Sequence, residues 1–222
     1  MPRNEYQAQL EKLRTDVRSM ADLVLERYEQ ALTVFETGET AVAEGIIKGD
    51  REINRLYLDL EGDCIRLLAL QQPVAGDLRF IASSFKIVTD LERIGDLTTN
   101  LAAYAMEGTD EPAPDVDLQE LGTFAQAMVA DAMVAYENEN AEKTWEIAAR
   151  DDDLDARCKA ASEQVVRRLL DHDLGGEATE AVLDDASRDL LTIRDVERVG
   201  DHAVNICART LYMIENDEGL IY

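Results

Sequence analysis

The strongest constraint on the fold is an internal repeat. Segments 90–100 (DLERIGDLTTN) and 195–205 (DVERVGDHAVN) share Asp, Glu, Arg, Gly, Asp and Asn in the same order, with conservative apolar exchanges between them. Upstream, segment 50–54 (DREIN) corresponds to segment 151–155 (DDDLD). The first pair is offset by 105 residues and the second by 101, so about four residues are inserted in the second half. The sequence therefore indicates a duplicated structural unit.

Apolar residues follow a helical period along most of the chain, as in Leu10, Leu13, Val17 and Met20. No strand pattern is present, and the sequence predicts an all-α fold of two tandem up-down three-helix bundles. The first bundle is expected to span residues 1–107 and the second 117–222, joined by the proline-containing linker 108–116. The expected helices run from an Asn4 cap to 37, then over 40–71, 74–106, 117–137 and 141–172, and from a Gly175-Gly176 turn to about 216.

The charge of the chain excludes several partners. Asp and Glu number 47 against 22 Lys and Arg, a net charge of −25, which disfavours nucleic acid and anionic membrane surfaces. Neither a membrane-spanning apolar window nor a signal peptide is present, so a soluble, cytoplasmic protein is expected. Only five of the basic residues are Lys, a composition typical of proteins from salt-loving organisms. Most of the acids therefore have an explanation as a solvated surface. The three unpaired cysteines are expected to be buried apolar residues.

Oxygen-bearing side chains recur at a spacing of four on the repeated segments, which places them on one face of a helix. Because like charges at this spacing repel, a positive counterpart is expected, either arginine or a metal ion. Oxygen donors favour Mg, Ca, Mn or iron, and zinc tolerates them. The alternative is an acidic face that is simply exposed to solvent. Because the same acidic pattern recurs in register in both halves, we favour a metal site. The candidate metal ligands are Asp50, Asn54, Glu92, Asp96, Asn100, Asp151, Asp155, Glu197, Asp201 and Asn205.

Other residues of the repeat have simpler explanations. Gly95 and Gly200 lie mid-helix, which indicates either close approach of a backbone or ligand, or tight helix packing. We expect Arg93 and Arg198 to pair with nearby aspartates or with the neighbouring bundle, and His202 to lie off the acidic face. The segment containing Phe124, Met128 and Met133 is either an outer contact surface or, by its spacing, part of the core.

No catalytic pattern supports an enzyme. The Glu-x-x-His pairs of di-iron oxidases, a Gly-x-Ser-x-Gly elbow and a Walker-type loop are all absent from the sequence. We predict a binding protein, with a metal-free helical scaffold and a metal-dependent phosphohydrolase as the alternatives.

The segment from Gly76 through Asp96 resembles the signature of the PhoU family of phosphate-uptake regulators, and segment 195–205 resembles its second copy. The resemblance covers the whole chain and implies two three-helix bundles that bind iron or zinc through E(D)-x-x-x-D pairs. It also implies a non-enzymatic protein that restrains uptake through the ATPase subunit of a phosphate ABC transporter and, in bacteria, a sensor histidine kinase. Independently of the resemblance, we expect a homo-oligomer, because a repeat with an acidic exterior needs one apolar outer face to meet a partner. Asn54 stands where the family pattern has Asp, and Leu97 where it often has His. The Asp-Leu-Arg lead-in is replaced by Val182-Leu183-Asp184 in the second half, so the two halves can differ in role.

Overall fold

The computed structural model describes residues 3–71, 73–107, 116–171 and 178–221, and within these ranges it contains helices and no strand, which confirms the predicted fold class. The helices are α1 (Arg3–Thr37), α2 (Thr40–Gln71), α3 (Ala75–Glu107), α4 (Leu118–Glu137), α5 (Ala141–Ala148), α6 (Asp151–Asp171) and α7 (Ala178–Glu215). Most of the linker 108–116 and the Gly175-Gly176 turn lie outside the described residues, as does His172.

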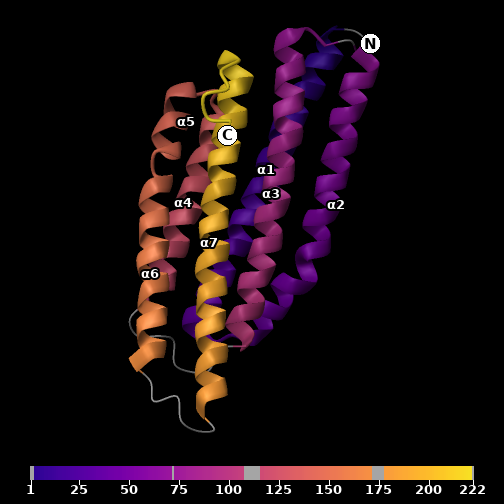
Figure 1. Ribbon diagram of the computed structural model, residues 1–222. Coiled ribbons are helices and arrows are strands. Elements are labelled where there is room, and N and C mark those ends of the chain that lie inside the picture. Colours follow the sequence, from indigo (N-terminus) through magenta and orange to yellow (C-terminus); the bar gives the residue numbers. More distant parts are fainter. Residues whose placement is uncertain (1–2, 72, 108–115, 172–177, 222) are drawn as a thin grey trace.

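The helices form an elongated antiparallel stack (Figure 1). Helices α1, α3, α4 and α7 lie in the middle, with α2 on one side and α5 and α6 on the other. The two halves meet where α3 packs against α7 and α1 packs against α4. No helix in the described part of the chain is long and apolar enough to cross a bilayer.

Burial of one stripe along each helix holds the stack together. On α1 the side chains of Leu13, Val17, Met20 and Val24 are almost fully buried, at the spacing of three and four that the sequence shows. The buried side chains of both halves form one continuous apolar cluster. Each large side chain contributes about 1.5–3 kcal/mol by leaving water, so the halves stabilise each other. Gly38, with a φ of 66°, ends α1 in the left-handed conformation that glycine adopts without strain.

The segment around Phe124 belongs to the core. Met128 and Met133 are fully buried, and Phe124 packs against the same cluster. The guanidinium groups of Arg150 and Arg157 lie 5.1 and 4.9 Å from the centre of the Phe124 ring. The core interpretation of this segment is confirmed.

The prediction of one helix over 141–172 is wrong, because the chain breaks between α5 and α6. The backbone N–H of Arg150 bonds the carbonyl of Ile147, three residues back, which tightens the end of α5. The Arg150 side chain turns to Asp131 on α4, with 2.6 Å between Nη1 and Oδ2. Three consecutive aspartates then begin α6, where the positive end of a helix dipole favours carboxylates. These aspartates are the sequence signal for the break.

Gly95 and Gly200 are explained by helix packing. A Cβ atom at Gly95 would lie 3.0 Å from Cδ1 of Ile53 on α2. A Cβ atom at Gly200 would lie 2.3 Å from Cδ2 of Leu154 on α6. Ile53 and Leu154 are equivalent positions of the repeat, so each half uses a glycine to bring its outer helix against α3 or α7. The same packing carries the acidic residues on each outer helix next to those on its neighbour.

Candidate functional site

Each half of the protein brings two acidic helix turns together. In the first half, which we call the first station, Asp50 and Asn54 on α2 lie beside Glu92 and Asp96 on α3. The second station consists of Asp151 and Asp155 on α6 and Glu197 and Asp201 on α7. The Ile53–Gly95 and Leu154–Gly200 contacts hold these turns in register. The carboxylates predicted from the repeat therefore form one cluster in each half.

The second station carries a strong concentration of negative charge. Burial, followed by repulsion from the nearby carboxylates of Asp155 and Asp201, raises the pKa of Asp151 to about 6. Burial followed by repulsion from Asp155 also raises the pKa of both Glu197 and Asp201. A bound cation would remove this repulsion, because it favours the ionised form of every carboxylate around it.

The first station is partly neutralised by its own side chains. The amide nitrogen of Asn54 donates to Oδ2 of Asp50 at 2.7 Å. The guanidinium of Arg93 lies 3.5 Å from Oε2 of Glu92 and 3.4 Å from Oδ2 of Asp96. Burial still raises the pKa of both of these acids, ahead of the repulsion among the carboxylates. Arg93 and the amide of Asn54 thus compensate part of the negative charge that a metal ion was predicted to neutralise.

One carboxylate oxygen in each station is buried without a partner. Oδ1 of Asp50 and Oδ1 of Asp151 accept no hydrogen bond from any residue that the structure describes. These two aspartates are equivalent in the repeat, so the same atom is left unsatisfied twice. An unsatisfied buried polar group costs about 1–3 kcal/mol. Each oxygen is therefore open to a proton, a water hydrogen bond or a cation.

The carboxylate oxygens of the stations have the chemistry that a hard cation prefers, but their side chains do not converge on a single point. In the described ranges no three His, Cys, Asp or Glu side chains converge as a preformed metal site. Carboxylate oxygens are the ligands that hard divalent and ferric ions prefer. Side chains in each station would have to turn towards a common point to complete a coordination shell.

Asn100 and Asn205, which were predicted as metal ligands, lie in the contact between the halves. Nδ2 of Asn100 donates to Oδ2 of Asp195 at 3.1 Å, and Nδ2 of Asn205 donates to Oδ1 of Asp90 at 3.3 Å. Both donors and both acceptors are repeat equivalents, so the two bonds are reciprocal. A reciprocal contact is the property of a twofold interface. The two halves are therefore related by a quasi-twofold axis between α3 and α7.

The two acceptors of this contact are strongly held. Asp195 is fully buried and also accepts from Arg194 at 2.9 Å and from the hydroxyl of Tyr104 at 3.4 Å. Nδ1 of His202 lies 2.9 Å from Oδ1 of Asp90, which confirms that His202 is off the acidic face. Arg198 lies 3.8 Å from Asp195, as expected, whereas Arg93 turns to Glu92 and Asp96 rather than to Asp90. Asp90 and Asp195, the first aspartates of the two motif copies, thus join the halves.

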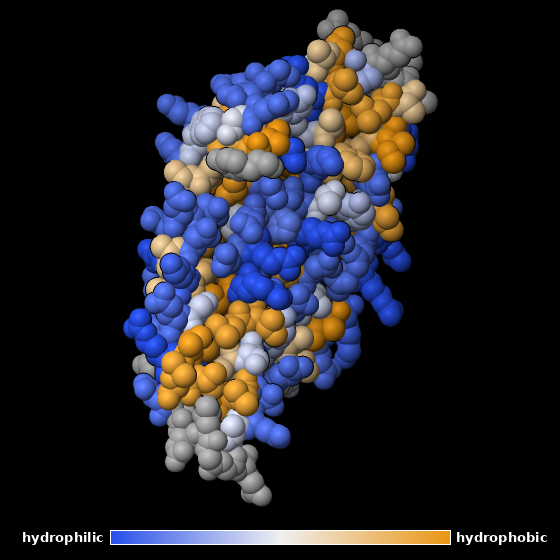
Figure 2. All heavy atoms as spheres, in the orientation of Figure 1, coloured by the Kyte–Doolittle hydropathy of each residue, from blue (hydrophilic) through white to orange (hydrophobic). Residues whose placement is uncertain are grey.

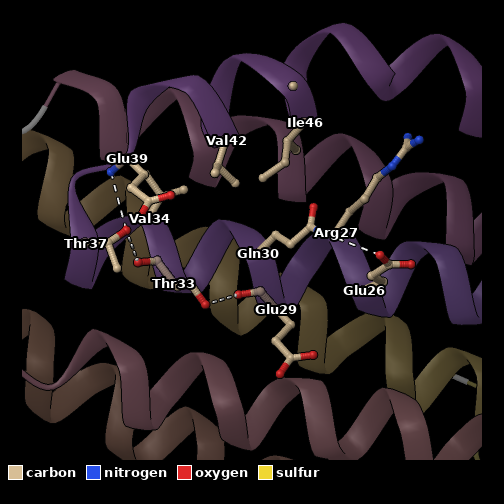
Figure 3. Close-up of a pocket in the computed structure, with 11 residues that line it drawn as sticks. Glu26, Arg27, Glu29, Gln30, Thr33, Val34, Thr37, Glu39, Val42 and Ile46 are labelled. Carbon is tan, nitrogen blue, oxygen red and sulfur yellow. Dashed lines mark hydrogen bonds between the residues drawn. The ribbon is translucent and has the colours of Figure 1, made fainter.

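Two hollows lie near these elements. A cavity of about 280 Å³ at the contact between the halves is lined by Asp50, Arg93, Asp96, Leu97, Thr99, Asn100 and Arg198. A larger groove of about 680 Å³ lies between α1 and α2 (Figure 3), where Gln30 on α1 lies opposite Val42 and Ile46 on α2. The groove contains none of the predicted ligands, and only the smaller cavity adjoins a station.

Comparison with known proteins places these features in a family. The model of the PhoU domain matches residues 17–105 and again 118–210. A PhoU homolog of Methanothermobacter thermautotrophicus is 33% identical, with 96% of this chain and 95% of the relative covered. A Streptococcus pneumoniae homolog is 32% identical, with 95% of both chains covered. The chain belongs to the PhoU family.

Solved structures of PhoU proteins share the whole fold. The PhoU crystal structure from Streptococcus pneumoniae superimposes with a TM-score of 0.87 at 29% identity, covering 96% of this chain and 98% of that one. PhoU from Pseudomonas aeruginosa gives a TM-score of 0.88 at 28% identity, with 96% and 100% covered. The two PhoU-domain matches fall on α1–α3 and on α4–α7, and each contains one station and one half of the reciprocal contact.

Proposed function

We propose that this protein is an accessory regulator of phosphate-specific transport that acts by binding other proteins. The observation that carries the proposal is the similarity over the full fold and nearly the full length to proteins named as phosphate-specific transport system accessory proteins. The residues that recur in both halves support binding over catalysis, since they form a pair of carboxylate clusters and a reciprocal contact between helices.

The proposed partner is the ATP-hydrolysing subunit of a phosphate transporter on the cytoplasmic side of the membrane, together with a phosphate-sensing histidine kinase where one is present. Binding restrains uptake when phosphate is abundant. Such a role requires contact surfaces rather than a reaction centre, and the long exposed helices of the two halves provide them.

We further propose that the stations hold iron, zinc or another divalent cation. Asp151, Asp155, Glu197 and Asp201 would hold it in the second station, and Asp50, Glu92 and Asp96 in the first. The support is the pair of unpartnered oxygens on Asp50 and Asp151 and the raised pKa values around them. When bound, the cation supplies positive charge that neutralises carboxylates at the junction of two helices, and it thereby stabilises each half.

Deletion of the gene tests the regulatory role. Uptake of labelled phosphate is measured in phosphate-starved and phosphate-replete cells, with and without the gene. Loss of the repression of uptake in replete cells, restored by a plasmid copy, is the expected result. Unchanged repression in the deletion strain would reject the regulatory role.

Metal analysis tests the cation separately. Protein purified without added metal is compared with a variant carrying Asp50→Asn and Asp151→Asn, and both are analysed by inductively coupled plasma mass spectrometry. Metal in the first protein and its loss from the variant are expected. The absence of bound metal from both, together with no uptake of iron, zinc or manganese on titration, would favour the metal-free scaffold.

A further inference from the structure

Two arginines of the repeated motif lie beside the first station. Figure 2 shows hydrophilic side chains across the middle of the molecule, where α3 and α7 lie side by side, between two more apolar ends. The small cavity at this contact is lined by Arg93 of the first half and Arg198 of the second. Asp50 and Asp96 also line it, and none of its described lining residues is a carboxylate of the second station. The cavity therefore belongs to the first station, although one of its arginines comes from the other half.

Arg93 and Arg198 are equivalent in the repeat, 105 residues apart, but they contact different acids. Arg93 lies 3.5 Å from Oε2 of Glu92 and 3.4 Å from Oδ2 of Asp96, both in the first station. Arg198 lies 3.8 Å from Oδ1 of Asp195, in the contact between the halves, and its side chain is 48% exposed. A charge-assisted hydrogen bond spans about 2.7–2.9 Å, so Asp195 does not hold Arg198 tightly. The guanidinium of Arg198 can therefore be shared with other acids.

The carboxylate of Asp96 is one of these acids. Burial, followed by repulsion from Asp50, raises the pKa of Asp96, and the guanidinium groups of Arg93 and Arg198 oppose this rise. Arg198 thus acts on the first station from the other half of the chain. It also opposes the rise in the pKa of Asp201 that burial and repulsion within the second station cause. Arg198 therefore lies between the two stations, at the contact between the halves.

The first station differs from the second in having two arginines beside its cavity. In the second station, after burial, every group that shifts the pKa of Asp151 or Glu197 is another carboxylate. A metal ion that enters the second station therefore mainly relieves repulsion. A metal ion that enters the first station meets positive charge already in place, because a guanidinium favours the ionised form of a carboxylate just as a metal ion does. The arginines and the metal ion are alternatives for the same carboxylates.

We propose that Arg93 and Arg198 are counter-ions that compete with a metal ion for the first station, and that Arg198 couples the filling of this station to the contact between the halves. The inference rests on the cation binding proposed above. A metal ion in the first station releases Arg198 from Asp96, so that Arg198 pairs with Asp195 alone. Because coupling between two binding events is reciprocal, the hold of Arg198 on Asp96 weakens the metal ion to the same extent. The two stations therefore fill at different metal concentrations, the second station first.

Manganese binding to the first station alone tests this proposal. The parent protein is the full chain carrying Asp151→Asn and Asp155→Asn, which remove carboxylates of the second station. Free manganese is measured by electron paramagnetic resonance during titration at constant ionic strength. Adding Asp50→Asn and Asp96→Asn to the parent identifies the binding that belongs to the first station.

The arginines are then replaced in this parent one at a time, as Arg93→Gln and Arg198→Gln. Arg66→Gln on α2 is the matched control, because its side chain is 64% exposed, pairs with Asp63 and carries the same charge. Circular dichroism shows that each variant keeps its helical content.

Arg93→Gln and Arg198→Gln should each tighten manganese binding about tenfold, since each removes a positive charge next to a divalent ion in a partly buried site. Arg66→Gln should leave the affinity unchanged. An unchanged or weaker affinity in Arg198→Gln overturns the proposal and leaves the proposed cation binding standing. No manganese binding by the parent or by either arginine variant rejects a metal ion in the first station together with this proposal. The regulatory role is decided separately, by deletion of the gene.

Urea unfolding separates competition from a structural role of Arg198. In chelator-treated protein, Arg198→Gln should lower the urea midpoint relative to the parent, because Asp96 and Asp195 lose a neutralising charge. In excess manganese the same variant should gain more stability than the parent, because it binds the metal ion more tightly. A residue with a structural role alone would lower the midpoint equally in both conditions, and that result would overturn the proposal.

Discussion

Replacing Asp151 by asparagine should stabilise the metal-free protein at neutral pH. The aspartate sits among three other carboxylates of the second station, and its Oδ1 has no hydrogen-bond partner in the described part of the chain. Asparagine has the same shape and carries no charge, so it removes the repulsion without creating a cavity. The effect should be specific to this position, because Asp152, next in the sequence, is exposed to water.

The magnitude follows from the raised pKa of Asp151. Its value of about 6 lies well above the 3.8 of an ordinary aspartate, and each tenfold change in proton affinity is worth about 1.4 kcal/mol. The full difference is about 3 kcal/mol, and partial exposure to solvent reduces it to about 1–1.5 kcal/mol. Between pH 4 and pH 6 the native state holds a proton that the unfolded state has lost. The free energy of unfolding therefore falls as pH rises through this window.

Urea unfolding of chelator-treated protein at pH 4.5 and pH 7.5 measures this effect at constant ionic strength. Asp151→Asn should exceed the wild type by about 1–1.5 kcal/mol at pH 7.5 and by only about a third of that at pH 4.5, while Asp152→Asn should match the wild type at both. Adding manganese or zinc should reverse the order, because the wild type then gains binding energy that the variant lacks. Equal stability of Asp151→Asn and wild type at pH 7.5 without metal would refute the argument from carboxylate repulsion.

The remaining predictions concern the asymmetry of the stations and the packing between their helices. Asn54→Asp should tighten cation binding in the first station, and Asp155→Asn should weaken it in the second, because affinity for a hard cation rises with ligand charge. Calorimetric titration measures both affinities. No change in either affinity would contradict the argument from ligand charge. Gly200→Ala should destabilise the protein by about 1–3 kcal/mol, because its methyl group would lie 2.3 Å from the buried Leu154. Gly62→Ala, with nothing within 4 Å of the new methyl group, should instead stabilise α2 by about 1 kcal/mol, and thermal unfolding that ranks the two alike would count against the packing explanation.

Much of the fold could be predicted from sequence because it depends on local signals. The bounds of α2 agree with the prediction at both ends, where a glycine precedes the helix and Pro73 follows it. The stations were also predictable, because a spacing of four fixes a helix face and the repeat offset fixes which turns correspond. The α5–α6 break was missed, since both helices keep an apolar period, which hid the start signal of the three aspartates at the beginning of α6. The prediction that Asn4 caps the first helix was also wrong, because α1 begins at Arg3 and Asn4 lies inside it.

Which residues of the motif belong to a station and which join the two halves could not be predicted from a single helix. Asn100 continues the stripe of Glu92 and Asp96 along α3, so its spacing alone suggests a ligand. In the structure it faces α7 and bonds Asp195, which belongs to the other half of the chain. The packing of α3 against α7 decides between these roles, and the sequence does not state how these helices pack. The presence of both Asp and Asn in each copy of the motif was the only sequence feature that allowed a reciprocal contact between the copies.

The reciprocal contact has a consequence for how the two halves can change. In a dimer of identical chains every substitution occurs twice, so the two sides of the axis stay alike. Here the equivalent halves lie in one polypeptide, and a substitution occurs on one side only. Leu97 and His202 already differ at equivalent positions, and only His202 contacts an aspartate across the axis. A single covalent chain thus keeps the geometry of a symmetric pair while letting the residues of its two halves differ.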